Sequence, residues 1–453
     1  TWLIARHAGG TFILRIEDTD QGRLVEGATD VIYRTMAECG LTHDEGPDVG
    51  GPVAPYIQSE RRDTYGKYAR LLVERGHAYY CFCEKTESEE ESGQFDRAAD
   101  PCRDLDPAQA QARVDAGEPY VIRQRIPEGG TTTFHDAIFG DITVENSTLD
   151  DQVLIKRDGL PTYNFANVVD DHLMGITHVV RGSEYLSSAP KYDLLYQGFG
   201  WEVPTYVHCS PVMRDQHNKM SKRHGDPSYE DLRAQGYLTE AILNYVALLG
   251  WSPRGDQAER EVFSLEELSE IFDIAGISKS PAIFDIEKLT HFNALYLRAM
   301  TPERFAQVAE PYIRRTVTDP ALDTAAIAAL LQARCERLTD IPEKVAFFQT
   351  LPAYEKDLFT NKKAKTNEEV ARTMLSAAIE ALEALPQWDQ ASVHDCLIAL
   401  AERLGTKNAT LMWPVRIAAA GQQVTPGGAV EICAILGREE CLRRLRLGLE
   451  KLS

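Results

Sequence analysis

The stretch Thr11-Phe-Ile-Leu-Arg-Ile16, followed by the acidic turn Glu17-Asp18-Thr19-Asp20, predicts a short apolar strand that ends in a polar loop. Before it, residues 2–7 have the character of the end of a helix, which Gly9 and Gly10 close. After it, residues 28–39 predict another helix. This order of helix, turn, strand and helix predicts an α/β fold with a parallel sheet.

The texture of the sequence changes along the chain. Residues 79–160 have short strand-like runs broken by Gly, Pro and Asp around the acidic segment 84–91, which predicts an inserted α+β module. Alternating strand and helix character returns over residues 177–206. The simplest interpretation is a nucleotide-binding type of sheet that is interrupted by an insertion.

Beyond Pro227 the chain is almost wholly helical in character. Residues 229–249 predict one helix that ends at Gly250. Ser264 and Glu267 have the spacing of a capping box, and Thr301-Pro302-Glu303 predicts a helix with proline in its first turn. Residues 301–453 predict two helical bundles.

Length and composition limit the classes of protein that the chain can belong to. The length of 453 residues suggests roughly three domains, and no run approaches the about 20 apolar residues that span a membrane. Nine cysteines are too few for a disulfide framework, which favours reduced thiols and a cytoplasmic location. The net charge of -21 would repel a polyanion on average, but phosphate binding depends on local groups of Lys and Arg. Such groups, for which solvated helix faces are the alternative explanation, occur at Arg61 and Arg62, at Lys362, Lys363 and Lys365, and at Arg443, Arg444 and Arg446.

The most specific short motif is Lys219-Met220-Ser221-Lys222-Arg223. Three cations within five residues, on a polar loop after a strand, could neutralise a reacting triphosphate. Positioned ammonium groups would meet the charge that develops on the α-phosphate and the leaving pyrophosphate. A basic surface loop is the alternative.

This segment resembles the second signature of class I aminoacyl-tRNA synthetases, usually written KMSKS, with Arg223 in place of the final serine. The stretches that resemble the glutamyl-tRNA synthetase family extend over nearly the whole chain; they are residues 12–20, 44–47, 58–61, 161–172, 181–188, 247–251, 284–289, 413–418 and 425–428. The resemblance implies an α/β fold: a Rossmann-type parallel-sheet catalytic domain with an α+β insertion, followed by all-α stem-contact and anticodon-binding domains. The implied bounds are 1–78 and 166–230 for the halves of the catalytic domain, 79–165 for an inserted acceptor-binding domain, 231–300 for the stem-contact domain, and 301–365 and 366–453 for two anticodon-binding helical domains.

The resemblance also implies an enzyme and its reaction. Such an enzyme uses ATP with Mg²⁺ to convert L-glutamate to glutamyl-adenylate, then transfers glutamate to the 3′-terminal adenosine of tRNA(Glu) with release of AMP and pyrophosphate. The implied partners are tRNA(Glu), with tRNA(Gln) as a second candidate, and no membrane; a monomer is usual for the family. The family's HIGH-type signature is not in the sequence, and we expect it upstream of Thr1.

Two alternatives remain open at this point. A catalytically inactive tRNA-binding relative would keep the fold without the ATP chemistry, although Glu17, Lys219 and Lys222 are present. A glutaminyl-tRNA synthetase would share the catalytic half but end in β-barrels, and the helical character of residues 301–453 argues against it.

By the resemblance, Glu17 receives the α-ammonium of glutamate, and Tyr163 and Asn167 orient the amino acid. Arg181 binds the side-chain carboxylate, because paired guanidinium donors match a carboxylate better than a neutral amide. Lys219 and Lys222 are the catalytic cations beside the phosphates, and Lys222, Glu184, Leu186 and Met213 bind ATP. The alternatives are a solvated turn for Glu17, a core role for Tyr163 and an ion pair of Arg181 with Glu184. The composition of Asp170-Asp171-His172 suggests a metal, but its position next to Tyr163 and Asn167 favours a structural turn under the substrate pocket.

A second group of residues suggests a metal. Cys81 and Cys83 are followed by Cys102 and Asp104, and thiolates with a distant fourth ligand can close a tetrahedral zinc site. The resemblance implies one structural Zn²⁺ with a variable fourth ligand; Asp104 is the candidate here and His77 its rival. Three isolated thiols are the alternative.

Overall fold

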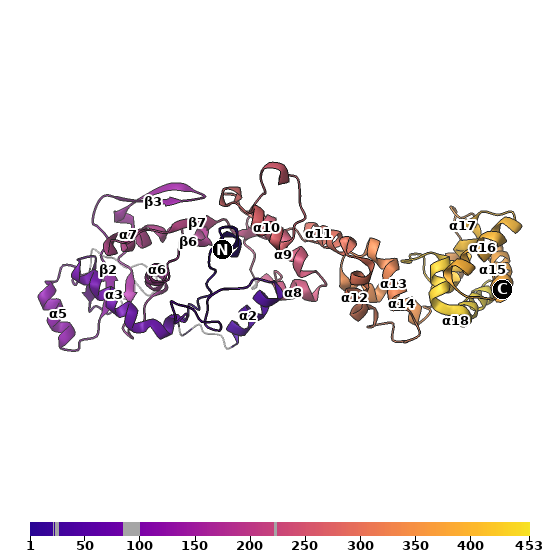
Figure 1. Ribbon diagram of the computed structural model, residues 1–453, viewed down its shortest axis with the longest axis horizontal. Coiled ribbons are helices and arrows are strands. Elements are labelled where there is room, and N and C mark those ends of the chain that lie inside the picture. Colours follow the sequence, from indigo (N-terminus) through magenta and orange to yellow (C-terminus); the bar gives the residue numbers. More distant parts are fainter. Residues whose placement is uncertain (21, 23–26, 85–99, 222–223) are drawn as a thin grey trace. The chain divides into compact units, whose positions relative to one another are not determined.

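The computed structural model describes residues 1–20, 22, 27–84, 100–221 and 224–453. The chain folds into two compact units, whose elements are labelled in Figure 1. Unit 1 comprises Thr1–Asp226 and Leu243–Phe284, and unit 2 comprises Pro227–Ile242 and Asp285–Ser453. Within the described ranges, no helix is both long enough and apolar enough to cross a membrane.

Unit 1 is an α/β structure. Its helices are α1 (Trp2–His7), α2 (Ala28–Glu38), α3 (Arg62–Glu74), α5 (Pro107–Asp115), α6 (Tyr163–Leu173), α7 (Ala189–Phe199) and α10 (Leu265–Ile271). Its strands are β1 (Ala78–Cys81), β2 (Val121–Gln124), β3 (Thr131–Asp136), β4 (Gly140–Glu145), β5 (Val153–Ile155), β6 (His178–Gly182), β7 (Thr205–Cys209), β8 (Val212–Met213) and β9 (Ala282–Ile283). The predicted α/β class is confirmed.

The strands form three sheets. One has the order β4-β3-β7-β6, in which β7 runs parallel to both β3 and β6 while β4 is antiparallel to β3. The sheet is therefore mixed rather than wholly parallel. Strands β1, β2 and β5 form an antiparallel sheet, and β8 pairs with β9 in parallel. The predicted inserted module, residues 79–165, thus contributes strands to two sheets.

The segment predicted as the first strand, residues 11–16, forms isolated parallel bridges but is not a strand of these three sheets. Ile13 forms a parallel bridge with Glu45, and Ile16 forms another with Ile57. The amide of Ile16 donates to the carbonyl of Tyr56 at 2.9 Å. These bridges hold the start of the acidic turn, at Glu17, in a fixed place beside residues 56–58.

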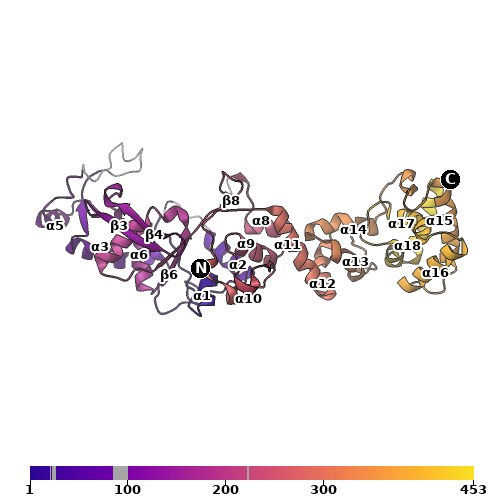
Figure 2. The same cartoon turned by 90° about the horizontal axis from the view of Figure 1, so that it is seen from above.

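Helices α3, α6 and α7 pack on one another and on the strands of unit 1, as Figures 1 and 2 show. Tyr65, Phe165, Tyr192 and Tyr206 belong to their shared core. At the end of α6 the ring of His172 lies flat on Trp201, with centroids 3.7 Å apart and an interplanar angle of 5°. Phe199 also stacks on Trp201, with centroids 3.9 Å apart.

The region predicted as one helix over residues 229–249 is two helices, so that prediction was wrong. Helix α8 (Tyr229–Ala234) belongs to unit 2, and α9 (Thr239–Leu248) runs from unit 2 into unit 1. Between them Gly236 has a φ of 89°, a left-handed conformation that favours glycine. A Cβ at Gly236 would lie 2.6 Å from the backbone nitrogen of Thr339, so close packing also requires glycine here.

In its described residues unit 2 otherwise consists of helices and the loops between them, with one isolated bridge between Asn361 and Thr366. Its remaining helices are α11 (Ile286–Ala299), α12 (Pro302–Ile313), α13 (Thr324–Leu331), α14 (Ile341–Gln349), α15 (Glu368–Glu383), α16 (Gln390–Arg403), α17 (Asn408–Ala420) and α18 (Ala429–Lys451). Thr301 caps α12, which begins with Pro302 as predicted. In unit 1 the predicted capping box of Ser264 and Glu267 is present at α10. The predicted domain 231–300 is divided between the two units, and the domain bounds stay predictions.

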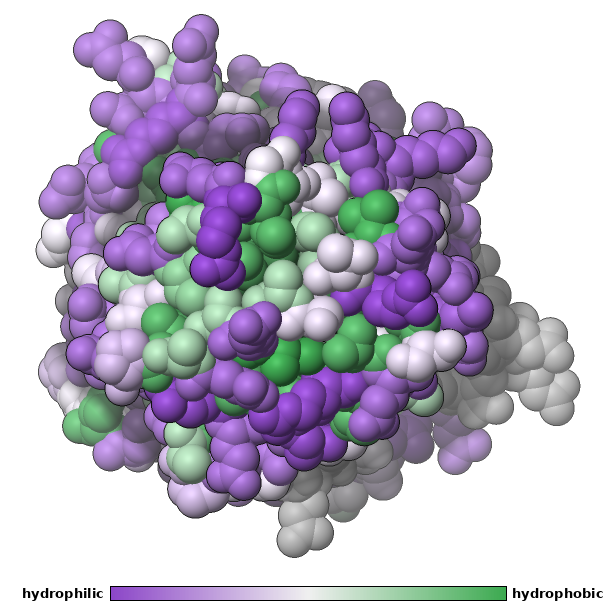
Figure 3. Space-filling model, turned by 90° about the vertical axis from the view of Figure 1, so that its right-hand side faces the viewer, coloured by the Kyte–Doolittle hydropathy of each residue, from purple (hydrophilic) through white to green (hydrophobic). Residues whose placement is uncertain are grey.

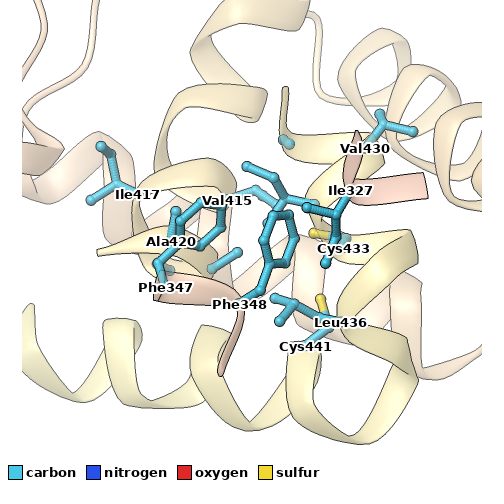
Figure 4. Packing of buried hydrophobic residues seen from close by; sticks show 14 of the residues in the cluster. Ile327, Phe347, Phe348, Val415, Ile417, Ala420, Val430, Cys433, Leu436 and Cys441 are labelled. Carbon is cyan, nitrogen blue, oxygen red and sulfur yellow. The ribbon is translucent and has the colours of Figure 1, made fainter. Parts of the chain in front are cut away.

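One apolar core joins the helices of unit 2. Figure 4 shows Phe347 and Phe348 of α14 among Val415 and Ile417 of α17, with side chains of α18 close by. Arg444 of α18 is fully buried against this core. Its guanidinium donates to the carbonyls of Phe347 at 2.6 Å, Ala419 at 2.9 Å and Phe348 at 3.1 Å. Arg444 therefore binds the C-terminal ends of both α14 and α17.

Figure 3 shows one face of the molecule, at the end where α15 to α18 lie in Figure 1. Apolar residues gather in the middle of this face, and hydrophilic residues surround them (Figure 3). Apolar surface with a polar rim is typical of interaction sites.

Candidate active site

One stripe of helix α6 carries three polar side chains. Tyr163, Asn167 and Asp171 follow one another at four-residue spacing, which places them on the same face of the helix. Asn167 is buried, and its amide forms no hydrogen bond of ordinary length and angle with the described residues. A buried amide whose hydrogen-bonding groups are not fully satisfied carries a desolvation cost that a bound molecule would offset. The predicted pair Tyr163 and Asn167 does lie on one helix face.

Arg181 lies near the end of β6, and its side chain is 10% exposed. Its guanidinium carbon is 4.9 Å from the ring centroid of Tyr192, 5.7 Å from that of Tyr185 and 6.0 Å from that of Tyr163. Burial opposes the charge, but Tyr163, Tyr192 and Asp171 raise the pKa of Arg181 above its usual value. The Nη1 atom is buried and has no hydrogen-bond partner in the part of the chain described. This guanidinium is thus held among aromatic rings with one donor group still available.

The acidic neighbour of Arg181 is Asp171, whereas the sequence suggested Glu184 as its ion-pair partner. Nη2 of Arg181 is 3.8 Å from Oδ2 of Asp171. Glu184 is exposed and bends back over Gly182, where a Cβ would overlap its carboxylate. Asp171 lies within α6, so the predicted structural turn at Asp170-Asp171-His172 is wrong: the segment is helical.

Glu17 joins the same cluster through Arg15. Its carboxylate accepts hydrogen bonds from Nη2 of Arg15 at 2.8 Å and from Nε at 3.3 Å, and its side chain remains 30% exposed. Arg15 also pairs with Asp171 at 2.9 Å. Burial raises the pKa of the Tyr163 hydroxyl, and both Arg181 and Glu17 act on it electrostatically. The structure therefore brings Glu17, Tyr163 and Arg181 together.

Arg15 and Asp171 are the members of this cluster that the sequence analysis did not assign to substrate binding. Arg15 is two residues from Glu17, and Asp171 continues the four-residue spacing of Tyr163 and Asn167. The helical spacing was the available signal for Asp171.

The predicted phosphate-binding loop is a hairpin that begins at β8. Met213 bridges to Lys219, and the amide of Arg214 donates to the carbonyl of Asn218 at 2.8 Å. Asp215 accepts from the side chain of Asn218 and from the backbone amides of His217 and Asn218, and these bonds lower the pKa of Asp215 to about 2.

The residues predicted to contact ATP differ from one another in their exposure to solvent and in the element that carries them. Lys219 is exposed on the hairpin, and Met213 is half-buried in β8. Leu186 follows the 3₁₀ turn Ser183–Tyr185 and packs on the core around α6 and α7. Lys222 lies outside the described residues. Its place beside the Arg181 cluster therefore stays a prediction.

The cysteines of the inserted module do come together. Ligand atoms of Cys81, Cys83, Asp100 and Cys102 all lie within 4.8 Å of one another. Sγ of Cys83 is 3.7 Å from Sγ of Cys102 and 3.5 Å from Oδ1 of Asp100. Burial raises the pKa of Cys83, so its thiol is neutral unless a cation is bound nearby.

The predicted fourth ligand, Asp104, is not part of this group. Its side chain is 84% exposed and faces Arg125 at 3.8 Å. Asp100 takes its place, because it is held in position by Tyr79, whose hydroxyl lies 2.9 Å from its Oδ2. His77, the rival ligand, is also absent from the group.

Comparison with known proteins finds two families that together match most of the chain. Residues 1–291 match the family of class I tRNA synthetases (E and Q), catalytic domain, and residues 304–449 match an anticodon binding domain. The fold and these matches define a class I aminoacyl-tRNA synthetase, an enzyme.

Similar proteins narrow this class. The chain is 54% identical over 461 residues to a glutamate–tRNA ligase of Clostridium botulinum, covering 100% of this chain and 94% of that protein. It is 54% identical over 458 residues to a glutamate–tRNA ligase of Clostridium novyi, with 100% and 93% covered. The crystal structure of a glutamate tRNA ligase from Elizabethkingia meningosepticum, in complex with its amino acid, matches with a TM-score of 0.87 and 32% identity over 100% of this chain and 95% of that chain. The chain belongs to the glutamate–tRNA ligase family, which confirms the resemblance seen in the sequence.

Proposed function

We propose that this chain uses ATP to activate L-glutamate and transfers it to the 3′-terminal adenosine of tRNA(Glu). The observation that carries the proposal is the cluster of Arg181 and Glu17. A buried guanidinium with an available donor suits a side-chain carboxylate, and a partly exposed carboxylate on the same cluster suits an α-ammonium. Similarity to glutamate–tRNA ligases over the full chain supports the same substrate.

In this proposal the α-carboxylate of glutamate attacks the α-phosphate of ATP, forming glutamyl-adenylate and releasing pyrophosphate. Lys219 and Lys222 stabilise the charge on the phosphates, and Mg²⁺ arrives with ATP. Glu184, Leu186 and Met213 contact the nucleotide. The terminal adenosine's hydroxyl then attacks the mixed anhydride and AMP leaves. The helical segment after Asp226 contacts the stem of the tRNA. The helices of residues 301–453 hold the anticodon, where unstacked bases can be read on their edges.

We also propose one structural Zn²⁺ at the cysteine cluster. Three thiol sulfurs and one carboxylate oxygen within 4.8 Å match the ligand types and number that zinc prefers. Cys81, Cys83, Cys102 and Asp100 would hold the ion. It would fix the end of β1 to the chain around residue 100.

The test is aminoacylation of purified tRNA(Glu) and tRNA(Gln) with glutamate and with glutamine. We expect glutamate to be attached to tRNA(Glu), and the second tRNA decides whether charging extends to tRNA(Gln). Failure to charge either tRNA with glutamate would refute the proposal. Charging with glutamine instead would support the glutaminyl alternative.

Arg181→Ala tests the assignment of the carboxylate-binding residue. Loss of charge-assisted hydrogen bonds should lower kcat/KM for glutamate by at least about a hundredfold. The KM for tRNA should stay within about twofold, because Arg181 is proposed to contact glutamate and not the tRNA. Arg304→Ala, at an exposed position on α12, is the control for the glutamate site and should leave the kcat/KM for glutamate unchanged. Equal activity of Arg181→Ala and the wild type would remove Arg181 from this role.

A further inference from the structure

Asp171 lies between the two arginines of the candidate active site. Its Oδ1 is 2.9 Å from Nη2 of Arg15, and its Oδ2 is 3.8 Å from Nη2 of Arg181. Arg15 in turn binds Glu17. A continuous chain of charges therefore connects Glu17, Arg15, Asp171 and Arg181, and the two end members are the groups proposed to bind opposite ends of glutamate.

The neighbouring residue Asp170 has quite different contacts. It is fully buried and accepts hydrogen bonds from Gln58 at 3.0 Å, Arg61 at 2.8 Å and Tyr65 at 2.6 Å. These hydrogen-bond partners lie outside the Arg181 cluster, although Asp170 acts electrostatically on Arg15. Asp170 thus stabilises the packing of α6 on α3, whereas the ion pairs of Asp171 are with Arg15 and Arg181, which face the candidate site.

The charges of the cluster balance. Burial raises the pKa of Asp171, and the ion pairs with Arg15 and Arg181 oppose that shift. With Asp171 ionised, two positive charges of Arg15 and Arg181 face two negative charges of Glu17 and Asp171. Without the carboxylate of Asp171, Arg15 would have Glu17 as its remaining acidic partner in this chain of charges. Stronger pairing with Arg15 would make Glu17 less available to an incoming ammonium group, since opposite charges attract strongly in a partly buried site.

We infer that Asp171 is a positioning residue for amino-acid selection, an inference that rests on the proposed function. Asp171 draws Nη2 of Arg181 toward α6 and leaves the unpartnered Nη1 for the substrate's side-chain carboxylate. Asp171 also pairs with Arg15, and this pairing weakens the attraction between Arg15 and Glu17. Both effects act on binding of the amino acid and on neither ATP nor tRNA.

Steady-state kinetics of Asp171→Asn, a change that keeps the shape and removes the charge, tests this inference. We expect the KM for glutamate to rise at least about tenfold with kcat within about threefold, because ground-state binding is lost. The KM for ATP and for tRNA should stay within about twofold. Asp171→Glu keeps the charge and should restore part of the glutamate affinity. An unchanged glutamate KM, or an equal rise for all three substrates, would overturn the inference.

Asp170→Asn is the matched control. It should lower the temperature of unfolding, because three hydrogen bonds to a buried carboxylate are weakened, yet leave the glutamate KM within about twofold. If Asp170→Asn raises that KM as much as Asp171→Asn does, a general structural effect explains both and the inference is wrong.

Calorimetric titration with glutamate separates this inference from the proposed function. Wild-type protein that binds glutamate, with Asp171→Asn at least about tenfold weaker, supports the role of Asp171 whether or not tRNA is charged. Equal affinity of the two proteins contradicts it. Charging assays on the wild type decide the proposed function alone.

Discussion

Asp100 and Asp104 lie four residues apart but in different surroundings. Asp100 is buried, accepts from the amide of Cys102 at 2.9 Å and lies beside the thiol of Cys83. Asp104 faces solvent and Arg125. The sequence pattern places either carboxylate near the cysteines, and the contacts of Asp100 with Tyr79, Cys83 and Cys102 in the folded chain distinguish the two.

The zinc content of purified Asp100→Ala and Asp104→Ala variants should differ, because only Asp100 lies beside the cysteines. We expect about one zinc per wild-type chain and a similar content in Asp104→Ala. Asp100→Ala should lose zinc to a chelator at least about ten times more readily, since a ligand is removed. Elemental analysis after graded chelator treatment measures this. If Asp104→Ala loses zinc and Asp100→Ala retains it, the assignment is reversed.

The sequence predicted part of the candidate site at the residue scale. Glu17, Tyr163 and Arg181 were assigned by their resemblance to a family, and the structure places them in one cluster. Helical spacing places Asp171 on the same face as Tyr163 and Asn167, but its pairing with Arg15 could not be predicted, because the two residues are more than 150 positions apart in the chain. No local pattern predicts such pairs.

At the scale of elements, Arg444 connects the ends of α14 and α17 with α18. Arg444→Met would leave the carbonyls of Phe347, Phe348 and Ala419 without this donor and should cost about 3 kcal/mol of stability or more. Arg443→Met is the control, because Arg443 is exposed and pairs with Glu440, a contact worth less than about 1 kcal/mol. Hydrogen exchange of α18 measures both. Equal protection of α18 in the two variants would contradict the role of Arg444.

Glu440 of α18 should make the stability of the protein depend on pH in the acid range. Hydrogen bonds from Arg443 and Arg444 lower the pKa of Glu440 to about 2. A carboxylate with a lowered pKa stabilises the folded state above its usual pKa, and that contribution is lost as pH falls toward the folded-state value. The wild type should exceed Glu440→Gln in urea midpoint at neutral pH, and the difference should shrink below a pH of about 4.5, toward about 2.

The exposed neighbour Glu439 supplies the control for this pH dependence. Glu439→Gln should differ little from the wild type at any pH, because surface charges without close partners contribute little. A difference between wild type and Glu440→Gln that stays constant across the acid range would show that the pairing of Glu440 with the arginines has no stabilising effect.

Helix ends were predictable where the signal is local. The caps at Ser264 and Thr301 need only the residues of the first turn. The break between α8 and α9 was missed, because Gly236 is required by its contact with Thr339, about a hundred residues away in the chain. The segment Thr11 to Ile16 was predicted as a regular strand, but in the structure it forms only isolated bridges with Glu45 and Ile57. Its sequence does not show how many backbone pairs these distant partners form.

At the scale of the whole molecule, the net charge of -21 has to be reconciled with a polyanionic substrate. Local groups of Lys and Arg must therefore supply the attraction to tRNA. We expect the KM for tRNA to rise steeply with salt, with a log–log slope of about 0.7 to 0.9 for each phosphate contacted. The KM for glutamate should rise much less, because its binding groups Arg181 and Glu17 are buried or partly buried and are screened less by salt. A tRNA KM that is insensitive to salt would contradict this account.

The stack of His172 on Trp201 gives unit 1 an optical reporter. Burial lowers the pKa of His172, so its ring is neutral at physiological pH. Protonation of an imidazole in face-to-face contact quenches indole fluorescence, and His172 directly follows Asp171 on α6. Emission from Trp201 should therefore fall on acidification, and a shift of the midpoint of that fall when amino acid is added would reveal occupancy without any label.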